Sequence, residues 1–78
     1  SPDEPSAESA ALDRAQVSQM RVLIGELSDR QREVLVLRYY LDMSEAEIAG
    51  LLGISAGSVK QHAFRAINRL ASRLEAAP

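Results

Sequence analysis

The residue types best suited to binding chemistry gather near the C-terminus, in the stretch "SVKQHAFR" at 58–65. Arginine and lysine pair with guanine edges or phosphates, glutamine can form two hydrogen bonds with adenine, and phenylalanine can contact a thymine methyl group. A serine in the first turn of a helix can also donate to a phosphate. The candidate DNA-contacting residues are Ser58, Lys60, Gln61, His62, Phe64 and Arg65.

One helix must carry these side chains. We predict it over 56–75, with Ser55 as its N-cap, because apolar residues recur there at the i, i+4, i+7 and i+8 positions. The predicted buried stripe consists of Val59, Ala63, Ala66, Ile67, Leu70 and Leu74. Phe64, the only phenylalanine, lies outside this stripe, beside Gln61 and Arg65. It either reads a base or packs on a sugar, or it covers a neighbouring helix at the edge of the stripe.

Three further helices are predicted upstream. The capping-box pattern "SEAE" begins a helix over 45–52, and Gly53 occupies the position of a left-handed C-terminal residue. The related pattern "SDRQ" begins a helix over 29–41. Helical spacing of apolar residues predicts a first helix over 9–27. The apolar residues of the first helix are Leu12, Met20, Leu23, Ile24 and Leu27, and those of the second are Val34, Leu35, Leu37 and Leu41. The buried candidates of the third helix are Ile48, Ala49, Leu51 and Leu52.

These predictions define an all-α fold of four helices, because no apolar residues alternate with a period of two. Only about three residues, 53–55, separate the last two helices, which is the spacing of a C-terminal helix-turn-helix. The shorter helix would set the angle of the longer one, whose N-terminal half could then enter the major groove. We expect no winged elements. An ordinary corner between two helices of a bundle is the structural alternative.

Charge is distributed unevenly along the 78 residues, whose net charge is −2. Residues 1–53 hold five arginines against ten acidic residues, whereas 54–78 hold four basic residues against one acid. The basic end coincides with the candidate DNA-contacting helix, although a solvated face would show the same pattern. Residues 1–8 carry two prolines and three acids. We expect them to form a flexible acidic linker or tail, which leaves 9–78 as the domain.

Composition disfavours several classes of protein. The chain has no cysteine and a single histidine, His62, so we expect no metal site and no cofactor. Its acidic residues accompany no nucleophile or base, and we do not expect an enzyme. It has no segment apolar enough to span a membrane and no signal-peptide pattern, which is consistent with a cytoplasmic protein. Because it begins with Ser1, we expect a piece of a longer chain.

The stretch "LSDRQREVLVLRYYLDMSEAEIAGLLGISAGSVKQHAFRAINRL" at 27–70 resembles region 4 of bacterial RNA polymerase sigma factors, in particular the extracytoplasmic-function group. The resemblance implies a cytoplasmic domain that binds double-stranded promoter DNA at the −35 element through its last helix. It also implies docking on the flap of the β subunit of core RNA polymerase, and masking by an anti-sigma factor or another regulatory protein. By position, the DNA-reading residues would be Lys60, Gln61, His62, Phe64 and Arg65, with Ser58 as a phosphate contact.

The sequence departs from the sigma-factor pattern at three neighbouring positions. A basic residue is usual where His62 stands, a larger aliphatic where Ala63 stands, and serine where Gln61 stands. His62 supplies less positive charge at neutral pH than arginine would, which weakens phosphate attraction. The preferred DNA sequence of the family is therefore not transferable to this chain.

Two alternatives stay open. LuxR-type regulators have a similar motif, and "VKQH" followed by "INRL" resembles them. The spacer "VLRYYLDMSEA" is one residue longer than theirs and carries the "LRYY" typical of sigma factors. A helical protein-interaction module is the other alternative, with the face around Phe64, or the surface of Tyr39 and Tyr40, binding a partner helix.

Overall fold

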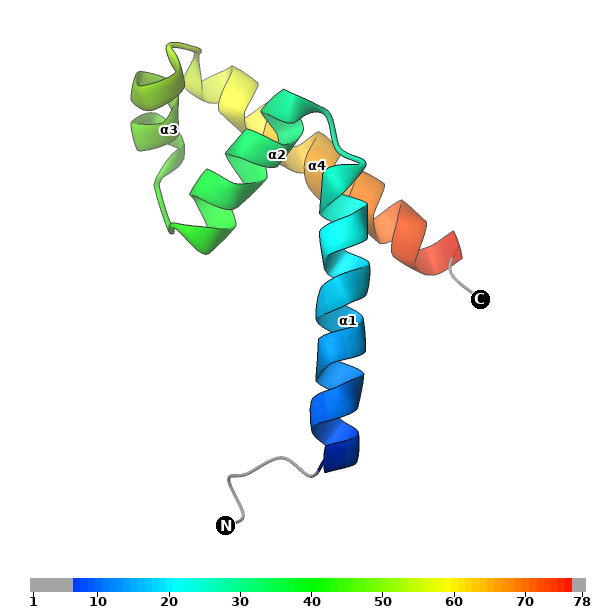
Figure 1. Ribbon diagram of the computed structural model, residues 1–78. Helices are drawn as coiled ribbons and strands as arrows, with labels where there is room; N and C mark the ends of the chain where they lie inside the picture. The colour runs from blue at the N-terminus through cyan, green and yellow to red at the C-terminus, as the bar shows by residue number, and fades with distance from the viewer. Residues whose placement is uncertain (1–6, 77–78) are drawn as a thin grey trace.

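The chain folds as an all-α domain in the computed structural model, which describes the backbone of residues 7–76 and the side chains of 14–76 (Figure 1). Its elements are α1 (Ala7–Gly25), α2 (Asp29–Leu35), the π-helix η1 (Val36–Tyr40), α3 (Glu45–Leu52) and α4 (Ala56–Ala76). No strand occurs within this part of the chain, as predicted. The linker predicted at 1–8 falls mainly outside the described residues, and α1 begins two residues before the predicted start.

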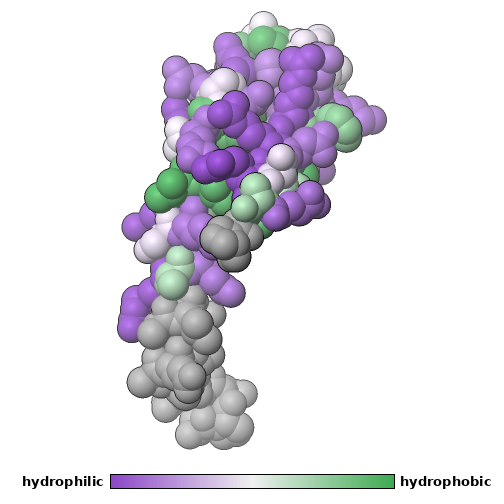
Figure 2. All heavy atoms as spheres, turned by 90° about the vertical axis from the view of Figure 1, so that its right-hand side faces the viewer, coloured by the Kyte–Doolittle hydropathy of each residue, from purple (hydrophilic) through white to green (hydrophobic). Residues whose placement is uncertain are grey.

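The helix α4 is the axis of the domain, because α2 and α3 both pack on it (Figure 1). The turn after α3 leads straight into α4, and α2 crosses the middle of α4. The N-terminal part of α1 points away from this body, and every side chain from Arg14 to Val22 is exposed. On the face shown in Figure 2, hydrophilic residues cover most of the body and hydrophobic ones form only small separate areas.

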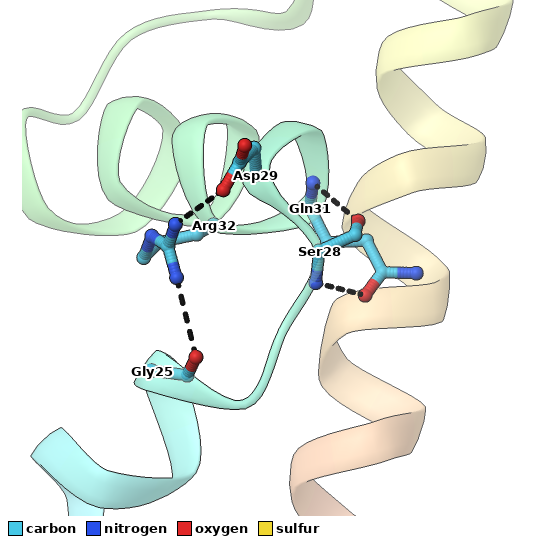
Figure 3. A network of polar contacts seen from close by, with 5 residues as sticks. All are labelled: Gly25, Ser28, Asp29, Gln31 and Arg32. Atoms are coloured by element: carbon cyan, nitrogen blue, oxygen red, sulfur yellow. Dashed lines mark hydrogen bonds and ion pairs between the residues drawn. The ribbon is translucent and has the colours of Figure 1, made fainter.

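Both predicted capping boxes are confirmed. At the start of α2, the Gln31 N–H donates to Ser28 Oγ at 3.2 Å and the Ser28 N–H donates to Gln31 Oε1 at 3.2 Å (Figure 3). At the start of α3, the Glu47 N–H donates to Ser44 Oγ at 3.1 Å and the Ser44 N–H donates to Glu47 Oε1 at 3.0 Å. Each box satisfies backbone donors that a helix otherwise leaves unpaired at its N-terminus.

An arginine joins the end of α1 to the start of α2 (Figure 3). Arg32 donates through Nη2 to Asp29 Oδ1 at 2.6 Å and through Nη1 to the carbonyl oxygen of Gly25 at 3.3 Å. The C-terminal carbonyls of α1 have no partner within their own helix, so this contact satisfies one of them. It also holds the short connection between the two helices.

The helix predicted over 29–41 changes its winding after Leu35. The segment η1 has π-helical hydrogen bonds, among them that from the Leu41 N–H to the Val36 carbonyl at 3.0 Å. Each π turn contains more residues than an α turn, so side chains after Leu35 rotate away from their α-helical positions. Leu41, one of the apolar residues of the predicted helix, is therefore exposed, as are Tyr39 and Tyr40.

The core consists of two clusters that meet along α4. Adjacent α2 residues divide between them, since Leu35 belongs to the first and Val34 to the second. The first cluster contains Leu23, Leu27, Leu35, Ala66 and Leu70. The second contains Val34, Ile48, Val59 and Ala63. Two alanines face the core from α4, which lets α2 and α3 approach it closely.

Several residues predicted to be buried lie on the surface instead. Leu51 is 62% exposed and Ile67 is 42% exposed, and Leu74 of the same predicted stripe as Ile67 is also exposed. The physical reason is the small number of helices, which cover only a narrow arc of α4 and one side of α3. Ile24, Leu37, Ala49 and Leu52 are partly buried. The side chain of Leu12 lies outside the described residues.

No helix within the described part of the chain is long and apolar enough to cross a membrane.

Candidate nucleic-acid interface

The turn between α3 and α4 has the geometry of a helix-turn-helix. Gly53 adopts the left-handed conformation, with φ 69° and ψ 33°, and its N–H donates to the Ala49 carbonyl at 2.9 Å. A residue without a Cβ adopts this conformation at no steric cost. Ser55 then caps α4, because its Oγ accepts from the Ser58 N–H at 3.0 Å. Ile48 of α3 and Val59 of α4 are both fully buried in the second core cluster, and this shared packing fixes the angle between the two helices.

Four of the six candidate DNA-contacting residues are fully available to a partner. Lys60, Gln61, Phe64 and Arg65 are exposed on α4. Phe64 is 67% exposed, so it does not close over a neighbouring helix. A large apolar side chain in this position, flanked by a cation and an amide, is available to a base or a sugar.

The other two candidates, Ser58 and His62, are half-buried. The Ser55 hydroxyl donates to Ser58 Oγ at 3.0 Å, so the hydrogen of the Ser58 hydroxyl itself stays available. That hydrogen lies in the first turn of α4, where the helix dipole also favours an anion. Ser58 is therefore suited to a phosphate contact.

A groove of about 280 Å³ borders the exposed face of α4, and we call it the basic groove. Its lining residues are Arg38, Tyr39, Glu45, Lys60, Ala63, Phe64 and Ile67. Arg38 and Lys60 are its two cations, and they come from elements distant in sequence. Sequence reasoning missed Arg38, because the preceding helix shows no pattern that relates it to α4. Its place next to Lys60 depends on the packing of η1 beside α4.

A second groove, of about 510 Å³, lies between α1, α2, η1 and α4, and we call it the apolar groove. Its lining residues are Met20, Ile24, Leu35, Val36, Tyr39, Tyr40, Ile67 and Leu70. None of these described lining residues has a charged side chain. Such a surface is suited to the apolar face of a helix.

Among the residues that the structure describes, no group of three or more His, Cys, Asp or Glu side chains is placed to hold a metal ion.

The capped turn, the buried contact between α3 and α4, and the exposed polar face of α4 define a helix-turn-helix domain. Residues 18–70 match the family model described as Sigma-70, region 4, and the chain belongs to this family. This membership separates it from the LuxR-type alternative.

Named relatives agree with the family. The chain is 49% identical to the RNA polymerase sigma-E factor of Streptomyces avermitilis over 49 residues. This aligned stretch covers 63% of the chain and 27% of that relative. Over 74 residues it is 34% identical to the RNA polymerase sigma factor CnrH of Cupriavidus metallidurans, covering 95% of the chain and 39% of the relative. Over 70 residues it is 34% identical to the ECF RNA polymerase sigma factor SigD of Mycobacterium tuberculosis, covering 90% of the chain and 33% of the relative. The chain thus spans about a quarter to two fifths of these relatives.

Proposed function

We propose that this chain is the −35-reading domain of an extracytoplasmic-function sigma factor, acting in the cytoplasm during transcription initiation by RNA polymerase. The observation that carries the proposal is the exposed face of α4, where Phe64 lies among Lys60, Gln61 and Arg65 behind a capped turn. Membership of the sigma-70 region 4 family supports it.

The residues on α4 take different roles in this proposal. Gln61, Phe64 and Arg65 contact base edges, since their side chains can distinguish adenine, thymine and guanine. Lys60 and Ser58 contact phosphates and set the register of the helix on the duplex. The half-buried His62 lies at the border of this surface and contributes a contact to the backbone or to a base.

The experiment is selection of bound sequences from a randomised DNA duplex pool at two salt concentrations. We expect a short enriched motif, lost or changed in Gln61→Ala and Phe64→Ala. Val22→Ala, which alters an exposed apolar residue of α1 that lines neither groove, is the matched control. Enrichment of the same motif by wild type and both α4 variants would contradict base reading by this face. An absence of any motif would contradict the proposal that the isolated domain reads DNA.

The apolar groove is the proposed docking site for the flap of the polymerase β subunit. Its described lining residues are all uncharged and come from four elements, which suits an apolar helix from a partner. An anti-sigma factor or another regulatory protein would compete for the same surface. Titration with an isolated flap domain tests this role, and we expect Tyr40→Ala to weaken binding because Tyr40 lines the apolar groove.

A further inference from the structure

The two grooves share a wall. Tyr39 and Ile67 line both the basic groove and the apolar groove. Tyr40 lines only the apolar groove, and Phe64 lines only the basic groove. Because Tyr39 and Ile67 belong to both surfaces, a molecule that fills one groove touches side chains that shape the other.

Tyr39 also contacts a cation of the basic groove. The Arg38 guanidinium carbon lies 5.7 Å from the centre of the Tyr39 ring, within the range of a cation–π interaction. Arg38 donates through Nη1 to the Met43 carbonyl at 3.4 Å, so the ring and this carbonyl together hold the cation. The ring itself is 59% exposed and is not fixed by burial.

The backbone beneath these residues is unusual. Arg38 and Tyr39 both lie in η1, whose π-helical winding often accompanies functional sites. The segment ends at Tyr40 with Leu41 as its C-cap, and the residue after Leu41, Asp42, has a positive φ of 55°. Such a conformation is uncommon for residues other than glycine. The orientation of the Tyr39 side chain therefore depends on a segment that is not regular α-helix.

We propose that Tyr39 is a positioning residue that couples the two grooves. A partner helix in the apolar groove packs on the Tyr39 ring, the ring holds Arg38 in the basic groove, and Arg38 meets the DNA backbone beside Lys60. The inference rests on the proposed function of each groove. It assigns a regulatory link between them, so that the protein partner strengthens DNA binding.

Thermodynamic linkage makes the effect reciprocal. If the partner raises the affinity for DNA, DNA raises the affinity for the partner by the same factor. The gain comes from ordering one or two side chains before DNA arrives, and we expect it to be roughly two- to tenfold in Kd. No change of fold is required.

The test measures the Kd of a short labelled duplex with and without a saturating amount of the isolated polymerase flap domain. In wild type, the flap should lower the Kd for DNA by this factor. In Tyr39→Ala, the affinity for DNA and the affinity for the flap should both fall, and the flap should no longer change the Kd for DNA. Tyr39→Phe keeps the aromatic face and should restore the coupling. If Tyr39 had only a structural role, the ratio of the Kd for DNA without the flap to that with the flap would not be lost in Tyr39→Ala and restored in Tyr39→Phe.

Two further variants separate the surfaces. Tyr40→Ala should weaken flap binding and leave the Kd for DNA alone unchanged, since Tyr40 does not line the basic groove. Val22→Ala should change neither affinity. Circular dichroism melting confirms that each variant is folded, which the exposure of Tyr39, Tyr40 and Val22 leads us to expect.

The outcomes are distinguishable. If the flap does not bind wild type, the role proposed for the apolar groove is wrong and the coupling falls with it. If the flap binds while the Kd for DNA stays equal or rises, the coupling alone is overturned. If Tyr39→Ala retains the full effect of the flap, Tyr39 does not carry the coupling.

Discussion

Arg73 binds Glu26 across 47 residues of sequence, donating from Nε to one carboxylate oxygen at 2.9 Å and from Nη2 to the other at 3.2 Å. The ion pair joins the C-terminal part of α4 to the segment that follows α1. It therefore holds the C-terminal end of α1 against α4, next to the first core cluster, which contains Leu23, Leu27 and Leu70.

The first prediction concerns this ion pair. Both side chains are partly exposed, so Arg73→Ala should lower the free energy of unfolding by at most about 1 kcal/mol. Amide hydrogens of residues 23–27 should exchange faster, because the pair restrains that segment. Arg69→Ala removes another cation from α4 and is the control. Equal exchange in the two variants would mean that the pair does not restrain α1.

Burial separates two residues of α3 that the sequence pattern placed together. Ile48 is completely buried, whereas Leu51 is 62% exposed. Ile48→Ala should cost about 2–5 kcal/mol of unfolding free energy, since it leaves a cavity in the second core cluster. Leu51→Ala should change stability by no more than about 0.5 kcal/mol. Urea titration measures both, and a similar loss in both would contradict the observed packing.

Substitution by aspartate should distinguish an apolar residue of α4 that lies in the core from one that lines the two grooves. Val59→Asp should unfold the domain, because it places a carboxylate where no solvent reaches. Ile67→Asp should leave the domain folded, since Ile67 is an exposed wall of both grooves. Circular dichroism reports the outcome. Unfolding of the Ile67 variant would indicate that Ile67 is a core residue, contrary to its observed exposure.

Glu47 makes the second capping box sensitive to pH. The backbone hydrogen bond from Ser44, followed by the contact with its hydroxyl, lowers the pKa of the Glu47 carboxyl from 4.5. The folded chain therefore holds its proton less tightly than the unfolded chain, and the stabilisation is present above 4.5 and lost as pH falls through the lowered pKa.

The matching variant is Glu47→Gln, which keeps an oxygen acceptor as Gln31 does in the first box. Denaturation midpoints at neutral pH and at pH about 3 should differ less for this variant than for wild type. An unchanged difference would show that Glu47 does not contribute to the pH dependence.

The salt dependence of DNA binding should distinguish the residues that contact bases from those that contact phosphates. Arg65→Ala should cost about 1–3 kcal/mol of specific binding if it pairs with a base. Lys60→Ala should weaken all sequences alike and reduce the salt slope by about 1. Arg14→Ala, on the exposed part of α1, serves as the control. An unchanged affinity of the Arg65 variant would show that Arg65 does not contact a base.

Local features were predictable from the sequence. The boxes at Ser28 and Ser44, the left-handed Gly53 and the cap at Ser55 each depend on residues three or four positions apart. Their hydrogen bonds form within one turn of chain, so no distant residue is needed to specify them. The exposed position of Phe64 followed from the apolar period of α4 for the same reason.

Burial and the grooves were decided by tertiary structure. Periodicity marks the side of a helix that is apolar, but only the neighbouring helices determine how much of that side is covered. Ile67 and Leu51 are therefore apolar and exposed, contrary to prediction. The π-helical winding of η1 brings Arg38 and Tyr39 beside α4, where they complete grooves that no local pattern predicts. The sequence by itself determined the helices, their caps and the polar face of α4, whereas packing across long sequence separations decided which apolar residues remain available to partners.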